Sequence, residues 1–125
     1  MKIIVLEDHL AISQALVDLI NAFCPVPTQI HTFYTLSALQ KHGVSGDLLI
    51  SDLSLPDSEA SNTANFLLGQ LGTIRIVCHS SKFDVGEQLA QASNGQIEYV
   101  KKGVEHDRLR DIICNLSEGE SFSAS

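Results

Sequence analysis

The chain has 125 residues, 44% of them hydrophobic and 18% charged, a composition that suits one globular domain and excludes disordered and fibrous classes. Eight Lys and Arg against fifteen Asp and Glu give a net charge of −7, which argues against direct binding of nucleic acid. Cys24, Cys78 and Cys114 form no C-x-x-C pair, so neither a disulfide framework nor a zinc knuckle is indicated, and the cytoplasm fits best.

The first expected element is a strand over residues 2–7. Its apolar run from Ile3 to Leu6 is cut off by Glu7 and is too short for a signal peptide or a membrane span. Similar short runs, rich in β-branched residues and Leu, predict further strands over 28–33, 47–51, 74–79 and 97–101.

Helical patterns alternate with these strands. Apolar residues from Ile12 to Phe23 follow one helix face, and Pro25 closes the segment. Thr35 is expected to cap a helix over 36–42, which Gly43 ends. Shorter helices are expected over 61–68, 85–92 and 109–116.

Strict alternation of five strands and five helices predicts a doubly wound α/β fold, with a parallel sheet covered on both faces. Ligands of such folds bind beyond the carboxyl ends of the strands. Polar residues stand at four of these ends in this sequence: Glu7, Asp8, Ser51, Asp52, Ser80, Lys101 and Lys102.

If the first and third strands are neighbours, Glu7, Asp8 and Asp52 converge and repel one another unless a cation compensates. Mg²⁺ suits such a site because it prefers carboxylate and backbone oxygens and keeps several waters. A phosphoryl donor placed there would meet an attacking carboxylate, a metal ion, a Lys and a hydroxyl. For any one acid, the alternative is a solvated helix cap, which suits Asp8 before a helix.

The segments EDH, SDLSLPD, VCHSS and YVKKG resemble, in order and setting, the receiver motifs of two-component response regulators. The spacings agree as well, with 52 − 8 = 44 positions from Asp8 to Asp52 and 102 − 80 = 22 from Ser80 to Lys102. The resemblance implies a flavodoxin-like fold with strand order 2-1-3-4-5 and a receiver domain over residues 1–117.

The resemblance also assigns roles to individual residues. Asp52 would be the phospho-acceptor, and Mg²⁺ would be held by Glu7, Asp8, Asp52 and the backbone carbonyl of Ser54. Ser80 and Lys102 would assist the reaction, and Ser80 and Tyr99 would switch the surface of the fourth helix, fifth strand and fifth helix. Only one of the adjacent lysines can reach the pocket, and the spacing selects Lys102.

The implied partner is a sensor histidine kinase, and no membrane is involved. The chain would be a phospho-acceptor that promotes only its own phosphorylation and dephosphorylation, not an enzyme, and it could form a homodimer. Residues 118–125 have the composition of a linker. The end of the chain resembles receivers that precede a LuxR-type helix-turn-helix, so DNA would be bound only through a domain beyond it.

Several positions depart from the family pattern. Ala60 stands where receivers usually carry Gly, residues 95–98 lack the usual small residues, and Gly103 stands where many members have Pro. Glu7 and Ser80 replace the commonest Asp and Thr with side chains of the same chemistry. These departures sustain one rival reading, a receiver-like module that no longer accepts phosphate and acts by protein contacts.

Two other functions fit less well. Phosphatases of the aspartyl-phosphate type resemble a first strand ending in D-x-D, whereas this one ends in E-D. A flavin-binding module would need free amides and hydroxyls where this chain has carboxylates. The five histidines have no ligand spacing, and only His79, beside Ser80, is close in sequence to the expected site; strand alternation is expected to turn it away.

Overall fold

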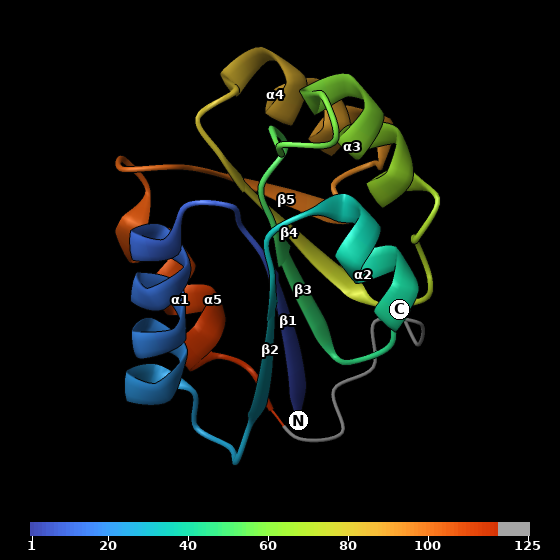
Figure 1. Ribbon diagram of the computed structural model, residues 1–125. Coiled ribbons are helices and arrows are strands. Elements are labelled where there is room, and N and C mark those ends of the chain that lie inside the picture. Colours follow the sequence, from blue (N-terminus) through green and yellow to red (C-terminus); the bar gives the residue numbers. More distant parts are fainter. Residues whose placement is uncertain (118–125) are drawn as a thin grey trace.

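The computed structural model describes residues 1–117 and contains one sheet of five parallel strands (Figure 1). The strands are β1 (Lys2–Leu6), β2 (Gln29–Phe33), β3 (Leu48–Ser51), β4 (Arg75–Ser80) and β5 (Ile97–Lys101). Their order is β2-β1-β3-β4-β5, so the predicted doubly wound α/β fold and its strand order are confirmed. The predicted linker, 118–125, lies outside the described residues.

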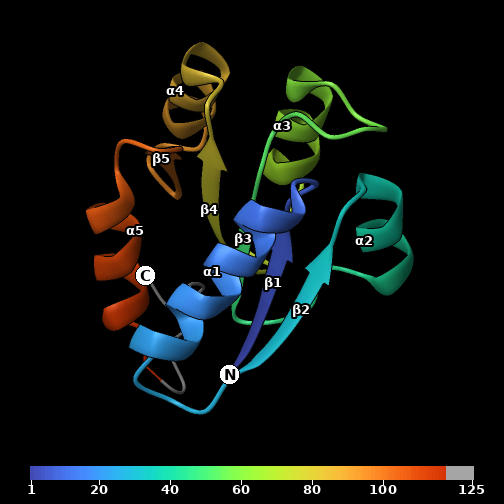
Figure 2. The same cartoon turned by 60° about the vertical axis from the view of Figure 1, so that its left-hand side comes forward.

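Five helices cover the two faces of this sheet. Figures 1 and 2 show α1 and α5 on one face and α2, α3 and α4 on the other. Their bounds are α1 (Leu10–Phe23), α2 (Leu36–His42), α3 (Ala60–Leu68), α4 (Phe83–Ala92) and α5 (His106–Cys114). All five predicted helices are therefore present, although four of them, α1, α3, α4 and α5, begin one to three residues before the predicted pattern.

The bounds of α4 and α5 both differ from the predicted ones. Helix α4 begins at Phe83, two residues before the predicted start, and α5 begins at His106 with a polar first turn that the apolar periodicity does not reveal. Helix α5 also ends at Cys114, so Leu116, although buried, lies beyond it.

Two hydrophobic cores lie against the sheet, one on each face. Ile3, Val5 and Ile50 pack with α1 and α5, whereas Ile4, Leu6 and Leu49 pack with the other helices. Alternate residues of β1 and β3 thus serve both cores, which is why these strands appear in the sequence as unbroken apolar runs.

The start of α2 is fixed by two side chains. The hydroxyl of Thr35 accepts from the backbone N–H of Ala38 at 3.1 Å, as its predicted capping role requires. The carboxylate of Asp57, in the β3–α3 loop, accepts from the N–H groups of Leu36 and Ser37, both at 2.9 Å. These bonds lower the pKa of Asp57 and tie its loop to α2.

The three cysteines are free in this structure, and Cys78 is buried in β4. Burial, and then the nearby charge of Asp52, raise the pKa of the Cys78 thiol to about 12. Within residues 1–117, no helix is long and apolar enough to cross a membrane.

Candidate functional site

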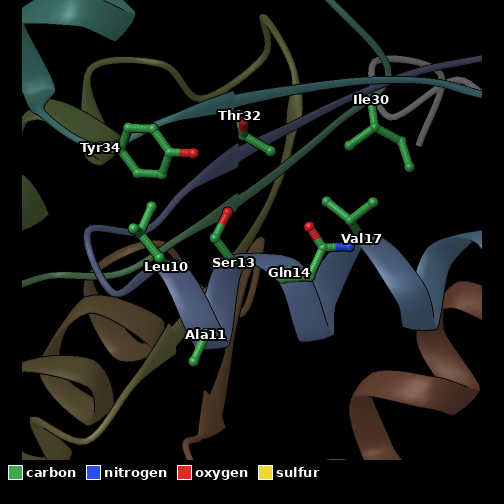
Figure 3. A pocket seen from close by; sticks show the side chains of 8 residues that line it. All are labelled: Leu10, Ala11, Ser13, Gln14, Val17, Ile30, Thr32 and Tyr34. Atoms are coloured by element: carbon green, nitrogen blue, oxygen red, sulfur yellow. The ribbon is translucent and has the colours of Figure 1, made fainter.

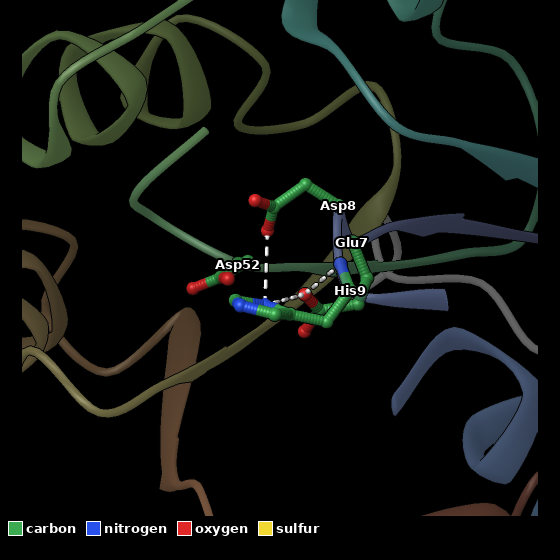
Figure 4. A group of neighbouring side chains, drawn as sticks. All are labelled: Glu7, Asp8, His9 and Asp52. Carbon is green, nitrogen blue, oxygen red and sulfur yellow. Dashed lines mark hydrogen bonds and ion pairs between the residues drawn. The ribbon is translucent and has the colours of Figure 1, made fainter. Parts of the chain in front are cut away.

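The parallel register brings the polar strand ends to one edge of the sheet. Leu6 lies opposite Ser51, and Ser51 lies opposite Cys78, so the residues that follow β1 and β3 emerge side by side. The expected convergence of Glu7, Asp8 and Asp52 is present, and His9 joins them (Figure 4). One ligand atom from each of these four residues lies within 4.8 Å of the others.

Asp52 is held on both carboxylate oxygens. Its Oδ1 accepts from the backbone N–H of Leu53 at 2.7 Å, and its Oδ2 accepts from the ammonium of Lys102 at 2.8 Å. Asp52 is 5% exposed, so a reacting group can reach it only from the open edge of the sheet. Lys101 turns the other way, with its Nζ 5.4 Å from the centre of the Phe83 ring, so the choice of Lys102 agrees with the geometry.

Lys102 also contacts Glu7, with 2.5 Å between its Nζ and Oε1. Burial raises the pKa of Glu7 and the charge of Asp52 adds to this, although Lys102 and the backbone N–H of His9 act in the opposite direction. Burial would lower the pKa of Lys102, but its bonds to Asp52 and Glu7 and their charges raise it overall. Lys102 therefore stays charged between two carboxylates.

Asp8 does not cap α1. The N-cap position belongs to His9, which makes no side-chain capping bond, so the reading of Asp8 as a helix cap is wrong. The Oδ1 atom of Asp8 is buried and has no hydrogen-bond partner among the described residues. Three carboxylates against one ammonium give a formal charge of −3 + 1 = −2 in the cluster, so its donor set fits a hard divalent cation.

The loop after β3 brings Ser54 close in sequence to this cluster. Backbone hydrogen bonds of 3.0 and 3.2 Å between Leu55 and Ser58 close a tight turn around Pro56. Ser54 precedes that turn and is half-buried. The role of its carbonyl as a metal ligand stays a prediction.

Ser80 and Tyr99 are directly linked. The Tyr99 hydroxyl donates to the backbone carbonyl of Ser80 at 3.0 Å, and the Tyr99 side chain is buried. The Ser80 hydroxyl accepts from the backbone N–H of Lys82 at 3.1 Å, at the start of α4. Tyr99 therefore lies inward in this structure, bonded to the strand that carries Ser80, and the switching role of the two residues stays a prediction.

His79 faces the opposite side of the sheet, as strand alternation predicts. It lines a cavity of about 440 Å³ between α1 and α5, together with Lys102 and His106. Burial, followed by the charge of Lys102, lowers its pKa to about 4. Its Nδ1 has no hydrogen-bond partner among residues 1–117.

A second hollow, of about 560 Å³, lies between α1 and β2 (Figure 3). Leu10, which is 68% exposed, and Tyr34 stand at its border, and no carboxylate or histidine lines it. The groups capable of phosphoryl or metal chemistry therefore lie around Glu7, Asp8 and Asp52 at the carboxyl ends of the strands rather than in this hollow. We call this part of the sheet the acidic edge.

The departures from the family pattern leave the acidic edge intact. Gly103 has a φ of +73° in the turn after Lys102, a conformation that Pro cannot adopt. Ala60 begins α3 without breaking it. Gly95, with a φ of +78°, lies in the turn before β5, at the end of that strand opposite to Lys102.

Two residues near the site were not singled out by sequence reasoning. His9 directly follows the acidic pair, and this adjacency was the available signal. Gly86, in α4, lies against Tyr99 so closely that a Cβ atom there would overlap the ring. No local pattern reveals this contact, because it joins a helix to a strand 13 positions away.

Comparisons with protein-family models and with curated proteins find no match. Solved structures do match. One is the response regulatory domain of mrkE from Klebsiella pneumoniae, with 21% identity, a TM-score of 0.72, and coverage of 90% of this chain and 92% of that one. Another is RcsB, in dimers bound to DNA, with 15% identity, a TM-score of 0.73, and coverage of 99% of this chain and 65% of that one.

A third match is the Mn²⁺-bound form of the response regulator Rcp1, with 17% identity and a TM-score of 0.65. It covers 90% of this chain and 88% of that one. The three likenesses agree on one architecture, and the chain therefore has the fold of response-regulator receiver domains.

Proposed function

We propose that this chain is the receiver of a two-component response regulator and accepts a phosphoryl group on Asp52. The observation that carries the proposal is the contact of Asp52 with Lys102, inside a cluster that also holds Glu7 and Asp8. The sequence motifs and the fold support the same reading. Among the described residues, these groups make up the chemistry that an acyl phosphate needs.

In the proposed reaction, a carboxylate oxygen of Asp52 attacks phosphorus and forms a P–O bond. The bond from phosphorus to the donor breaks, and the donor leaves with the electron pair. Lys102 balances charge on the phosphoryl oxygens, and the Leu53 N–H orients the attacking carboxylate. Such transfer depends mainly on positioning and electrostatics, which a buried and doubly hydrogen-bonded Asp52 provides.

We also propose that Mg²⁺ is held by Asp8, Asp52 and the Ser54 carbonyl, with Glu7 acting through water. The formal charge of −2 and the unpartnered Oδ1 of Asp8 support a divalent ion here. When bound, the ion would supply positive charge for the phosphoryl oxygens. Rcp1, which has the same fold, is known in a Mn²⁺-bound form.

The output would be a change at α4, β5 and α5. A phosphoryl group on Asp52 would draw the Ser80 hydroxyl away from the Lys82 N–H, releasing the bond at the start of α4. Tyr99 would then hold its position by its bond to the Ser80 carbonyl while α4 moves around it. Amide shifts recorded with and without beryllofluoride should therefore be largest in the β4–α4 loop and α4.

The donor would be a sensor histidine kinase in the cytoplasm, a setting that the three free cysteines support. The output would be transcription, through a LuxR-type DNA-binding domain following this one. RcsB, of which the chain covers 65%, is known in DNA-bound dimers.

The test is phosphorylation of the whole chain by a small-molecule phosphodonor with Mg²⁺, read by intact mass and mapped by peptide analysis. Wild type should gain one phosphoryl group on Asp52, and Asp52→Asn should gain none. Asp107→Asn, which changes an 83% exposed acid on α5, is the matched control and should behave as wild type. Incorporation by Asp52→Asn, or by wild type without a divalent ion, would contradict the proposal.

The rival function is a receiver-like module that acts by protein contacts alone. It predicts a folded protein that remains unmodified under the same conditions. Its sequence support, the departures at positions 60 and 95–98, is weakened because neither interrupts the acidic edge. A folded wild-type chain without an adduct would nevertheless favour this rival.

A further inference from the structure

His9 lies over the acidic pair that precedes it. Its Nδ1 is 3.2 Å from Oε2 of Glu7 and 3.3 Å from Oδ1 of Asp8, and the ring is 66% exposed (Figure 4). Its backbone N–H also donates to the same Glu7 oxygen at 3.1 Å. The turn after β1 therefore presents one imidazole nitrogen and two carboxylate oxygens together.

We propose that His9 is a nitrogen ligand through which this site binds zinc-class divalent ions, with Glu7 and Asp8 as the oxygen ligands. This inference deepens the proposed function, because it rests on the metal site that the phosphoryl transfer would use. A zinc-class ion bound there would occupy carboxylates that the proposed Mg²⁺ site also uses.

The distances from the His9 ring nitrogen to the two carboxylate oxygens fit such an ion. Around tetrahedral zinc with bonds of about 2.0 Å, neighbouring ligand atoms lie about 3.3 Å apart. The two distances from Nδ1 of His9 agree with that value. A water or thiol can complete the coordination from the open side.

Burial gives a second, independent reason for a cation. Glu7 is 1% exposed and its Oε1 is paired with Lys102, whereas the buried Oδ1 of Asp8 has no hydrogen-bond partner among residues 1–117. Lys102 contacts Glu7 Oε1, whereas the ionisable group beside Asp8 Oδ1 is the His9 ring, with 3.3 Å to its Nδ1. Buried carboxylate oxygens are rarely left without a partner.

The types of ligand atom decide which divalent ion gains most in binding affinity from His9. Imidazole nitrogen suits Zn²⁺, Ni²⁺ and Cu²⁺, whereas Mg²⁺ prefers oxygen ligands alone. His9 therefore adds affinity for the first group and little for Mg²⁺. If His9 is instead a charged imidazole in an ion pair with Glu7 and Asp8, its positive ring competes with every divalent ion. Removal of the ring would then tighten the binding of both Zn²⁺ and Mg²⁺.

Calorimetric titration of the whole chain with Zn²⁺ and with Mg²⁺ separates these accounts. Other zinc ligands are first removed in a background variant, His42→Ala with Cys114→Ser, since the rings of His31 and His42 are 5.4 Å apart and Cys114 is exposed. In that background, His9→Ala should weaken Zn²⁺ binding about ten-fold or more and leave Mg²⁺ binding unchanged. His106→Ala is the matched control and should change neither.

Two further readouts fix the site. Long-range proton–nitrogen spectra should show a shift of the His9 ring nitrogens when Zn²⁺ is added, and Asp8→Asn should weaken both ions. Tighter binding of both ions by His9→Ala would establish the ion pair instead, and unchanged Zn²⁺ affinity would overturn the inference. Since binding is measured without a phosphodonor, a failure of phosphorylation on Asp52 leaves this result standing.

Discussion

Lys102 is the residue on which the charge balance of the acidic edge depends. Its ammonium contacts both Glu7 and Asp52, and its pKa is raised by them despite burial. A cation in this position stabilises the negative charge of a phosphoryl group but repels a metal ion. It should therefore favour phosphorylation and weaken metal binding.

Lys102→Ala should therefore slow phosphorylation of Asp52 by about 100-fold, the usual effect of removing one charge-stabilising donor. The same variant should bind Mg²⁺ more tightly, by a few-fold, since a competing charge is removed. Phosphorylation rates and calorimetric titration measure the two effects. Lys101→Ala, which removes an ammonium near Phe83 instead, should leave both unchanged; equal loss in the two variants would show that only net charge matters.

His79 makes the stability of the fold depend on pH. When unfolded it binds a proton below its ordinary pKa of 6.5, but when folded it stays neutral down to about 4. The unfolded state thus takes up more protons in this window, and stability falls as the pH decreases through it. Lys102 and His106 oppose the charged form as well, whereas Asp52 favours it.

Wild type should therefore lose about 2 kcal/mol between pH 7.5 and pH 5 relative to His79→Leu, in which this titration is absent. Denaturant unfolding at the two pH values measures the difference. His42→Gln, at an exposed position, should follow wild type. Parallel pH dependence in wild type and His79→Leu would mean that other groups dominate.

At the scale of the elements, the contact between α4 and β5 is set by one glycine. Gly86 lets α4 lie directly on the Tyr99 ring, and Phe83 meets that ring edge-on with 6.2 Å between centroids. The position of Tyr99 is therefore determined by the missing side chain at Gly86 together with the bond to the Ser80 carbonyl.

Gly86→Ala should destabilise the chain by about 1–3 kcal/mol, because the added methyl group overlaps the ring. Helix propensity acts the other way, by about 1 kcal/mol, so packing is expected to prevail. Thermal or denaturant unfolding measures the net effect, and a second change, Tyr99→Leu, should recover part of the loss. Gln88→Ala, on an exposed part of α4, controls for propensity; a Gly86→Ala chain more stable than wild type would contradict the close packing.

The elements themselves could be predicted because buried parallel strands and amphipathic helices leave strong local patterns. The Thr35 cap and the apolar runs of β1 and β3 are such signals. The polar first turn of α5 is not, and neither is the bond from Asp57 to α2, which spans about 20 positions. Packing between distant segments, such as Gly86 on Tyr99, has no trace in local periodicity.

The candidate site was predictable for a related reason. Parallel strands all end at one edge, so polar residues after β1, β3, β4 and β5 had to meet once the strand order was known. The pairing of Lys102 with Asp52 follows from that geometry. The inward position of Tyr99 and the placement of His9 depend on side-chain packing and on a loop conformation. Local sequence patterns do not reveal either of these.

At the scale of the whole molecule, the charge of −7 governs contact with nucleic acid. The described arginines lie beside acids rather than in a basic stripe: Arg75 and Arg108 contact Glu98, and Arg110 contacts Asp107. A surface of this kind offers little for phosphate neutralisation.

The 125-residue chain should therefore not retard duplex DNA at low salt in an electrophoretic assay. A longer protein carrying a following DNA-binding domain, if the reading frame encodes one, is the positive control. Retardation by the 125-residue chain would show that it has a DNA-binding surface despite its net charge, and the salt dependence of the retardation would report how many phosphates are contacted.

The buried thiol of Cys78 gives this fold a built-in reporter of opening. It sits at the centre of β4 behind Asp52, and its high pKa leaves it almost entirely un-ionised while the sheet is closed. The chain has no tryptophan for fluorescence, yet a thiol reagent can modify Cys78 only in molecules whose sheet has come apart. With Cys24 and Cys114 replaced by Ser, the rate of Cys78 modification measures how often the central strands separate under native conditions.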